Sequence, residues 1–374
     1  MKNKITKIDY DNCLANLTSS ILKYFDCLPE HKTLKIVDDI LKKNKPKNVV
    51  LFVCDGMGVS ILNKNLDKNK FFNKYLVTSI DSVFPPTTAA ATTSLMSGLY
   101  PNEHGWSGWE AYYKDTNQVI EMLTNKIKDT TQIASDKNVA FQKYPYKTIF
   151  SMISEQGNKA YYISKFGDVK YNTVKEANNI VEDLCKKDGK KFIYTYFLNP
   201  DETMHIYGND SIEAKKVINE LNESIENVSK KLDDTLVLVT ADHGHINCKV
   251  VFLEDYPDLF NTLEHNTAGD CRAVMFYIKD NMNLEFERLF NKYFGSDFIL
   301  LNKEEVLKNN IYGYGKNNKL FENSLGDYLA IGINNVVLKY QRYGRILLSN
   351  HSGITEDEIK VPLIIYYKGI DDKK

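Results

Sequence analysis

Five continuous apolar runs of strand length recur along the chain, and they restrict the possible fold more than any other feature. Each run spans five to seven residues, and polar, turn-forming and helix-like segments separate the runs. A strand that is apolar throughout is covered on both faces, which is typical of a parallel sheet between two layers of helices. The sequence therefore predicts an α/β fold with a mostly parallel central sheet. The runs are residues 48–54, 160–164, 192–198, 235–240 and 361–367.

Two longer segments add to this prediction. Residues 211–231 place apolar side chains at helical spacing, so we expect one amphipathic helix that covers the sheet. Residues 272–345 contain strand-like and helix-like patterns of their own, without a Pro-rich or Gly/Ser-rich linker at either end. We therefore predict that residues 1–271 and 346–374 form the core, and that residues 272–345 form a small inserted α/β cap.

The composition excludes several classes of protein and partner. Hydrophobic residues make up 43% and the formal net charge is −1, so neither disorder nor binding to a nucleic acid polymer is expected. No apolar run approaches the roughly 18 residues of a membrane span, and the N-terminus lacks the apolar segment of a signal peptide. The six cysteines form no C-x-x-C pair, as in a reducing compartment. We expect a cytoplasmic protein without a membrane partner; the sequence gives no oligomeric state.

Polar residues follow the predicted strands, which is where an open α/β sheet collects its ligand. Asp55 ends the first strand, and Gly56 and Gly58 permit a sharp turn after it, although an aspartate here could also be a helix cap. Thr88 stands at the start of a helix of small residues, where Thr87, Thr92, Thr93 and Ser94 are competing candidates. Free amides and the positive end of the helix dipole favour an anion at that position, whereas a plain N-cap threonine is the alternative.

Aspartate and histidine recur in three further segments. Asp201 and His205 lie four residues apart, so one helical turn would bring both to one face. Asp242 and His243 leave another predicted strand, and His351 precedes the last strand. Each histidine alone could be an ordinary buried polar residue. Together, such Asp/His sets suit zinc or a similar divalent ion, and two ions can hold both oxygens of an in-line displacement at phosphorus.

The order of these segments resembles the nucleotide pyrophosphatase/phosphodiesterase family of the alkaline phosphatase superfamily. In chain order the shared motifs are DG, P-x-T-T, PDxxxH, ADHG and H-x-G-x-T-x-x-E, and the matches extend from residue 48 to residue 367. The resemblance implies an alkaline phosphatase-like core and two divalent metal ions, with Zn²⁺ preferred and Mn²⁺ as the alternative. It also implies hydrolysis of phosphodiester or pyrophosphate bonds in a small, nucleotide-like substrate.

Seven residues of this chain match the metal ligands and the nucleophile of that family. Thr88 would be the catalytic nucleophile, esterified as phosphothreonine during turnover. The implied ligands of the first metal are Asp201, His205 and His351. The implied ligands of the second metal are Asp55, Thr88, Asp242 and His243.

The sequence departs from the family downstream of Thr88. An asparagine that contacts the phosphoryl oxygen in the family is replaced in the segment WSGW, residues 106–109. We expect Trp106, Trp109 and Tyr112 to offer a flat wall that binds a base, against the alternative of an aromatic mini-core.

Four further histidines have no place in the ligand sets. His245 could brace a metal ligand or lie on the surface, and His104 is expected to brace the end of the helix that begins at Thr88. His31 and His265 receive no role.

Arginine is scarce, and all four arginines follow residue 271. A phosphomonoester is largely dianionic, and the arginine fork holds its terminal oxygens best. We therefore expect phosphodiesters or pyrophosphates to be preferred over monoesters. The alternatives are a phosphomonoesterase, phosphonate hydrolase or phosphomutase on the same scaffold and, more distantly, an inactive metal-bound binding protein. A sulfatase is disfavoured, because that branch resembles a C-x-P-x-R signature where this chain has Thr88.

Overall fold

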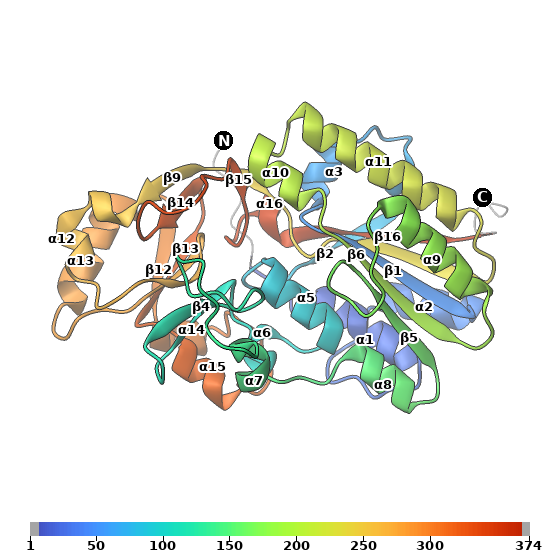
Figure 1. Ribbon diagram of the computed structural model, residues 1–374, viewed down its shortest axis with the longest axis horizontal. Coiled ribbons are helices and arrows are strands. Elements are labelled where there is room, and N and C mark those ends of the chain that lie inside the picture. Colours follow the sequence, from blue (N-terminus) through green and yellow to red (C-terminus); the bar gives the residue numbers. More distant parts are fainter. Residues whose placement is uncertain (1–6, 369–374) are drawn as a thin grey trace.

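The five predicted strands lie in one six-stranded sheet at the centre of the larger lobe (Figure 1). The computed structural model describes residues 7–368. The strands of this sheet are β1 (Asn48–Cys54), β2 (Leu76–Asp81), β5 (Lys159–Ile163), β6 (Lys191–Phe197), β7 (Thr235–Thr240) and β16 (Lys360–Tyr367). Their order is β2-β16-β7-β1-β6-β5, and β7, β1, β6 and β5 are parallel neighbours. Within this sheet only β16 runs antiparallel to its neighbours, so the predicted α/β fold with a mostly parallel sheet is confirmed.

No apolar run in the sequence marks strand β2. Its residues, LVTSID, include three polar side chains, and four of the six residues are partly or fully exposed. The strand lies at the edge of the sheet, where one side has no neighbour and continuous apolar character is not required. This strand is therefore identified only by the tertiary structure.

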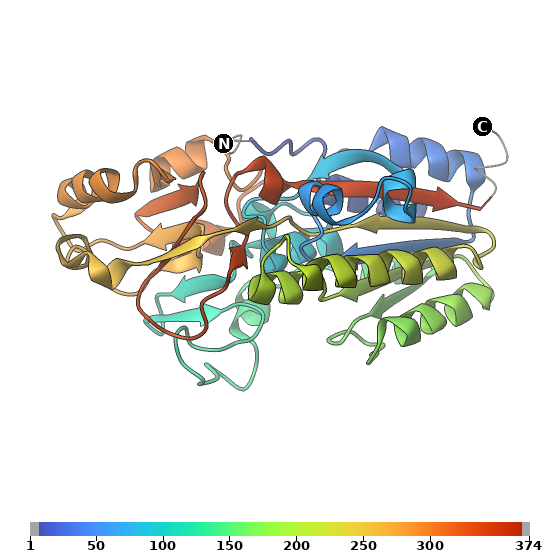
Figure 2. The same ribbon diagram turned by 90° about the horizontal axis from the view of Figure 1, so that it is seen from above.

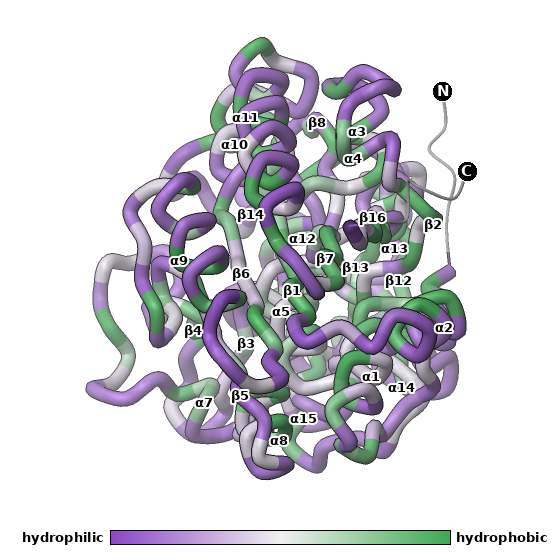
Figure 3. The backbone as a smooth tube through the Cα atoms, turned by 90° about the vertical axis from the view of Figure 1, so that its right-hand side faces the viewer, coloured by the Kyte–Doolittle hydropathy of each residue, from purple (hydrophilic) through white to green (hydrophobic). Residues whose placement is uncertain are grey.

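Two layers of helices cover the sheet, as Figures 1 and 2 show. In one layer α1, α5 and α8 pack against one another, and in the other α11 packs against α3 and α9. In Figure 3 the residues of β1 and β7 at the centre of the molecule are hydrophobic, whereas α9 and α11 contain many hydrophilic residues. Within the described residues, no helix is long and apolar enough to cross a membrane. The helices of this lobe are α1 (Leu14–Tyr24), α2 (Lys35–Asn44), α3 (Val59–Asn65), α4 (Phe71–Lys74), α5 (Thr88–Ser97), α8 (Ile149–Glu155), α9 (Val174–Lys186), α10 (Asp201–Tyr207), α11 (Ile212–Ser229) and α16 (Glu356–Ile359).

Helix α11 is the amphipathic helix predicted at residues 211–231. The hydroxyl of Ser211 accepts a hydrogen bond from the backbone N–H of Ala214 and so caps its first turn. Ile218, Leu221 and Ile225 are buried along one face, which explains the helical spacing of the apolar residues.

The smaller lobe is built on a second, antiparallel sheet. Its strand order is β12-β13-β11-β10-β3-β4, and the aromatic face of α13 packs on it through Phe286 and Phe290. Its strands are β3 (Glu110–Tyr113), β4 (Gln118–Glu121), β10 (Ala268–Asp270), β11 (Ala273–Phe276), β12 (Phe298–Asn302) and β13 (Tyr328–Gly332). The helices of this part of the chain are α6 (Pro101–His104), α7 (Val139–Lys143), η1 (Leu253–Asp255), α12 (Pro257–Phe260), α13 (Asn283–Phe294), α14 (Lys303–Lys308) and α15 (Lys319–Ser324).

The segment predicted as the cap supplies three strands of this second sheet. The sheet also takes β3, β4 and β10 from before residue 272. The domain boundaries at residues 272 and 345 therefore stay a prediction. Two short pairs of strands complete the structure: β8 (Ile246–Asn247) with β15 (Ser349–Asn350), and β9 (Lys249–Phe252) with β14 (Val336–Lys339). The β9–β14 pair lies on the smaller lobe (Figure 1).

A fully buried ion pair fastens the smaller lobe to the larger one. Arg272 donates from Nε and Nη2 to the two carboxylate oxygens of Glu358 at 2.7 and 2.9 Å, and both side chains are 0% exposed. Nη1 donates to the carbonyl oxygens of Asn334 and Val336. Glu358 also accepts hydrogen bonds from the backbone N–H of Gly353 and the hydroxyl of Thr355. Because every partner is satisfied, removal of either charge leaves the other buried and unpaired.

Replacement of Arg272 should therefore destabilise the protein strongly. We expect Arg272→Met to lower the free energy of unfolding by about 3–5 kcal/mol, as for other broken buried ion pairs. Arg288 forms an exposed pair with Glu285, so Arg288→Met should cost less than about 1 kcal/mol and is the matched control. Urea denaturation of the three proteins measures both values. Equal midpoints for the two variants would contradict the role of this pair.

Candidate active site

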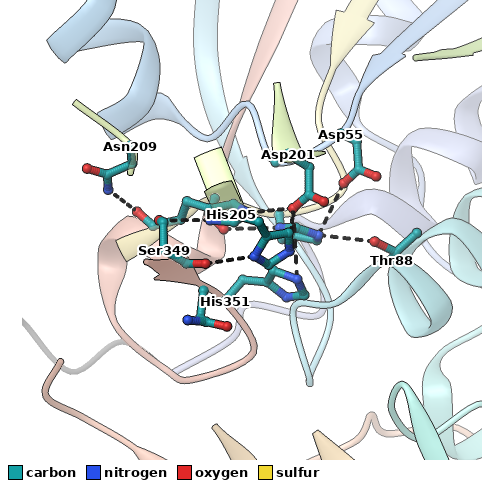
Figure 4. A network of polar contacts seen from close by, with 12 residues as sticks. Asp55, Thr88, Asp201, His205, Asn209, Ser349 and His351 are labelled. Carbon is teal, nitrogen blue, oxygen red and sulfur yellow. Dashed lines mark hydrogen bonds and ion pairs between the residues drawn. The ribbon is translucent and has the colours of Figure 1, made fainter. Parts of the chain in front are cut away.

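The seven residues matched from the sequence meet at the carboxyl ends of β1, β6 and β7. The register explains why, because Cys54 pairs with Phe197 and Val53 pairs with Thr240, so the three strands end side by side. The loops that follow them carry the aspartates, α5 brings Thr88, and the segment after β15 brings His351 (Figure 4). Four of them, Thr88, Asp201, His205 and His351, line a cavity of about 470 Å³ between the two lobes.

The first ligand group is centred on Asp201. The Nε2 atom of His205 lies 3.3 Å from Asp201 Oδ1, and Nε2 of His351 lies 3.9 Å from the same oxygen. These residues and His245 each offer a ligand atom, and all four atoms lie within 4.8 Å of one another. Such a set of one carboxylate and several imidazoles fits a divalent ion of the zinc type.

The second ligand group is centred on His243. Its Nε2 atom lies 3.3 Å from Asp55 Oδ1 and 3.7 Å from Asp242 Oδ2. Both of these carboxylate oxygens are buried and have no hydrogen-bond partner in the described structure. Burial and the neighbouring Asp242 and Asp201 raise the pKa of Asp55. Because unpaired buried carboxylates are costly, this arrangement fits a bound cation.

The backbone fixes the orientation of three of the histidines. In each of them Nδ1–H donates to a backbone carbonyl oxygen. His205 donates to Ser349 at 2.7 Å, and His243 donates to Gly244 at 3.0 Å. The third, His351, donates to the carbonyl of Pro86 at 3.1 Å. The lone pair of each Nε2 therefore faces the cluster, which is the usual arrangement of a metal-binding histidine.

His245 is buried and braces the first ligand group rather than lying on the surface. Its Nε2 atom lies 2.5 Å from Asp201 Oδ1, and its Nδ1 atom lies 2.9 Å from the hydroxyl of Ser349. Asn209 donates to the carbonyl of His245 at 2.9 Å and fixes the backbone as well. Both ring nitrogens are thus occupied, which suits a residue that positions Asp201.

Tyr196 is a site residue that the sequence did not reveal. Its hydroxyl donates to Asp55 Oδ2, so Asp55 keeps its other oxygen turned toward His243. Tyr196 lies in the apolar run of β6, where it reads as an ordinary core residue. No signal in that run distinguishes its hydroxyl from the buried aromatic rings around it.

Thr88 is the threonine whose hydroxyl faces the cluster. It is the first residue of α5, and its Oγ1 atom lies 3.3 Å from Nε2 of His243 (Figure 4). Thr92 and Thr93 instead donate to carbonyls one turn earlier in the helix, at 2.7 Å each. Thr87 is fully buried, and its hydroxyl has no partner in the described structure.

His104 braces the end of α5, as predicted. Its Nε2 atom lies 3.0 Å from the hydroxyl of Ser94, and its Nδ1 atom accepts a hydrogen bond from the backbone N–H of Trp106. Burial lowers the pKa of His104 to about 3, so the ring is neutral and its Nδ1 atom can accept.

The three residues predicted to form the aromatic wall have different surroundings in the structure. Trp106 is 0% exposed, donates its indole N–H to the carbonyl of Tyr144 and packs edge-on against Phe141. Tyr112 stacks on His265, with ring centroids 4.0 Å apart, and lies outside the residues that line the cavity. Of the three, Trp109 alone lines the cavity together with Thr88 and His351.

None of the four arginines lines the cavity. Arg272 is committed to Glu358, Arg342 pairs with Glu254 and Asp255, and Arg288 pairs with Glu285. The cationic side chains of the cavity wall are Lys128 and Lys339.

Comparisons with known proteins agree with this geometry. The sequence model described as type I phosphodiesterase / nucleotide pyrophosphatase matches residues 49–292. Murine ectonucleotide pyrophosphatase / phosphodiesterase 5 is similar in structure, with a TM-score of 0.65 and 17% identity over 84% of this chain and 87% of that chain; an inactive form of it is solved in complex with AMP. Phosphonoacetate hydrolase from Sinorhizobium meliloti 1021, in complex with phosphonoformate, has a TM-score of 0.62 and 14% identity over 86% of this chain and 90% of that chain. A search of curated protein sequences found no match.

Loss of His245 should weaken metal binding, because Asp201 would lose the partner that orients it. We expect His245→Ala to lower the affinity for Zn²⁺ about 10- to 100-fold, as is typical when such a partner is removed. Titration of metal-depleted protein against a competing chelator measures the affinity. His265→Ala, which removes an imidazole outside the cluster, is the control. Unchanged Zn²⁺ affinity in His245→Ala would show that Asp201 is held by other contacts.

Proposed function

Because the chain belongs to the type I phosphodiesterase / nucleotide pyrophosphatase family, we propose that it hydrolyses phosphodiester or pyrophosphate bonds of small, nucleotide-like substrates. The proposal depends on one observation. The Oγ1 atom of Thr88 stands at the start of α5, 3.3 Å from His243 Nε2, and Thr88 lines the cavity together with Asp201, His205 and His351. A hydroxyl so placed can attack a phosphorus atom bound between the helix amides and the histidines.

Two divalent ions, Zn²⁺ in preference to Mn²⁺, would bind in the two ligand groups and would stabilise charge on the attacking and departing oxygens. Asp201, His205 and His351 would hold one ion. Asp55, Asp242, His243 and Thr88 would hold the other.

Thr88 carries the reaction through two displacements at phosphorus. Its Oγ1 atom forms a bond to phosphorus while the bond from phosphorus to the departing oxygen breaks, and the threonine proton leaves with the departing group. A water molecule then forms a new bond to phosphorus, the Oγ1–phosphorus bond breaks, and a water proton returns to Thr88. The first amides of α5 point toward an anion at this position throughout.

The charges around Thr88 favour a diester over a monoester. A lysine ammonium has three N–H donors. The ammonium group of Lys128 donates to Glu110 Oε2 at 2.7 Å, to the Thr267 carbonyl at 2.9 Å and to the Thr267 hydroxyl at 3.2 Å. No donor of Lys128 is left for the second negative charge of a monoester. A singly charged diester needs none.

Phosphonate hydrolysis is the second candidate, since the fold is shared with a phosphonoacetate hydrolase. A substrate of that kind carries a carboxylate beside the phosphonate. The occupied donors of Lys128 and the absence of arginine from the cavity favour the diester. Release of inorganic phosphate from phosphonoacetate tests this candidate directly.

We also propose a cytoplasmic location. All six cysteines are free thiols, and none is paired in the structure. This pattern is common in a reducing compartment. Fractionation of cells that express the protein, followed by immunodetection, tests it.

Replacement of the nucleophile should abolish turnover. We expect Thr88→Ala to reduce kcat for bis-(4-nitrophenyl) phosphate by at least roughly 10³-fold while the bound metal content stays unchanged. Release of nitrophenol and metal analysis of the purified protein measure the two quantities. Thr92→Ala, one turn further along α5, is the matched control. Full activity in Thr88→Ala would assign the nucleophile elsewhere.

The ratio of rates on two nitrophenyl substrates should identify the branch of the family. We expect kcat/KM for bis-(4-nitrophenyl) phosphate to exceed that for 4-nitrophenyl phosphate, because no arginine lines the cavity and the donors of Lys128 are already bound. Both rates are measured with the same metal and at the same pH. A ratio clearly below one would move the protein to the monoesterase or phosphomutase branch.

A further inference from the structure

The hydroxyl of Thr87 is buried next to the proposed nucleophile without a hydrogen-bond partner. Thr87 directly precedes Thr88, is 0% exposed, and lines the same cavity. Within the described residues its Oγ1 atom has no donor or acceptor to bond with. A buried hydroxyl without a partner costs free energy relative to an apolar side chain of the same shape. The hydroxyl of Thr87 is therefore not explained by stability.

The other hydroxyls of this helix have partners. Thr92, Thr93 and Ser97 each donate to the carbonyl oxygen four residues earlier, at 2.7 Å. The hydroxyl of Ser94 also has a partner, a histidine ring at the end of the helix. Among the buried hydroxyls from residue 87 to residue 97, a stretch that the structure describes in full, only that of Thr87 is unpaired.

Thr87 does not cap α5, although a threonine at this position usually does. It is the residue before the first helical residue, and its hydroxyl accepts no hydrogen bond from the amides of the first turn. Its backbone is fixed on both sides, because its N–H donates to the carbonyl of Pro85 and its carbonyl accepts from the N–H of Ala91, both at 2.9 Å. The first turn thus positions Thr87 without using its hydroxyl.

The start of α5 therefore combines two kinds of donor beside Thr88. The first N–H groups of the ten-residue helix have no partner inside the helix and form the positive end of its dipole. The hydroxyl of Thr87 adds a hydrogen atom that no protein group accepts. A phosphate is the kind of anion that such a set binds. A phosphorus atom attacked by Thr88 Oγ1 would lie next to the side chain of the preceding residue.

We propose that the hydroxyl of Thr87 donates a hydrogen bond to a non-bridging oxygen of the phosphate that Thr88 attacks. The proposal rests on the proposed phosphodiesterase activity and assigns a further substrate-binding residue to the same site. The donor would hold the phosphate in line with Thr88 Oγ1 and would balance part of its negative charge, in a cavity that no arginine lines. No proton is transferred in this contact, since the hydrogen atom stays on Thr87.

Thr87→Val tests the proposal, because valine has the shape of threonine without the hydroxyl. We expect kcat/KM for bis-(4-nitrophenyl) phosphate to fall about 10- to 100-fold, the range for a lost hydrogen bond to a charged group. The midpoint of urea denaturation should stay the same or rise, because the variant removes an unpaired buried hydroxyl. A fall in both quantities would indicate a structural role and contradict the proposal.

Two further variants separate the hydroxyl from the shape of the side chain. Thr87→Ser keeps the hydroxyl and should keep most of the wild-type kcat/KM. Thr93→Val removes a buried hydroxyl that already has a partner and should leave kcat/KM unchanged. Equal losses in Thr87→Val and Thr87→Ser, or no loss in Thr87→Val, would overturn the donor role. A loss in Thr87→Val as complete as that in Thr88→Ala would also overturn it, because Thr87 would then be the nucleophile.

The donor role and the phosphodiesterase activity can fail separately. If wild-type protein and Thr87→Val hydrolyse the diester equally well, the activity stands and the donor role is wrong. If the wild-type protein hydrolyses no diester, the activity is wrong, and calorimetric binding of inorganic phosphate to the metal-loaded protein decides the donor role. The Kd should then be about 10-fold higher for Thr87→Val than for the wild type and Thr87→Ser. The same Kd in all three proteins would rule the donor role out.

Discussion

Three aspartates crowd into one buried cluster, and the organisation of the larger lobe depends on how their charge is balanced. Asp55, Asp201 and Asp242 are all less than 9% exposed, and Asp55 and Asp242 each keep one oxygen without a partner. Uncompensated carboxylates at this depth would cost more free energy than a domain can supply. The family is metal-dependent, and the imidazoles that surround the aspartates have their Nε2 atoms turned inward. This arrangement of carboxylates and imidazoles suits a bound cation.

In the smaller lobe, too, the buried cationic side chains already have partners. The fully buried Arg272 pairs with Glu358 and so connects the two lobes, and Lys128 donates to Glu110 and Thr267. At the cavity wall the carboxylates of Glu110, Glu121, Asp129 and Asp270 therefore stand beside only two lysines, Lys128 and Lys339.

Several features of the site could be predicted from the sequence because they depend on local spacing. Asp201 and His205 come together through one turn of α10, and Asp55, Asp242 and His243 directly follow buried strands that an apolar run identifies. The parallel order of those strands then brings the segments to one edge of the sheet. Tyr196, Ser349 and Asn209 could not be found in this way, since each acts across more than 30 positions of sequence and looks like core or loop.

The sequence by itself determined the α/β fold, five of the six strands of the central sheet and the residues proposed for metal and phosphorus chemistry, because periodicity and motif spacing are local properties. Only the tertiary structure separated Trp109 from Trp106, although the two lie three residues apart in one motif. The N–H of Trp106 is bound by the carbonyl of Tyr144, whereas Trp109 remains free beside β3. The structure likewise decided which lysine donors are already occupied and which carboxylates are unpaired. Those properties depend on contacts between distant segments, such as Lys128 with Thr267, and no local pattern records them.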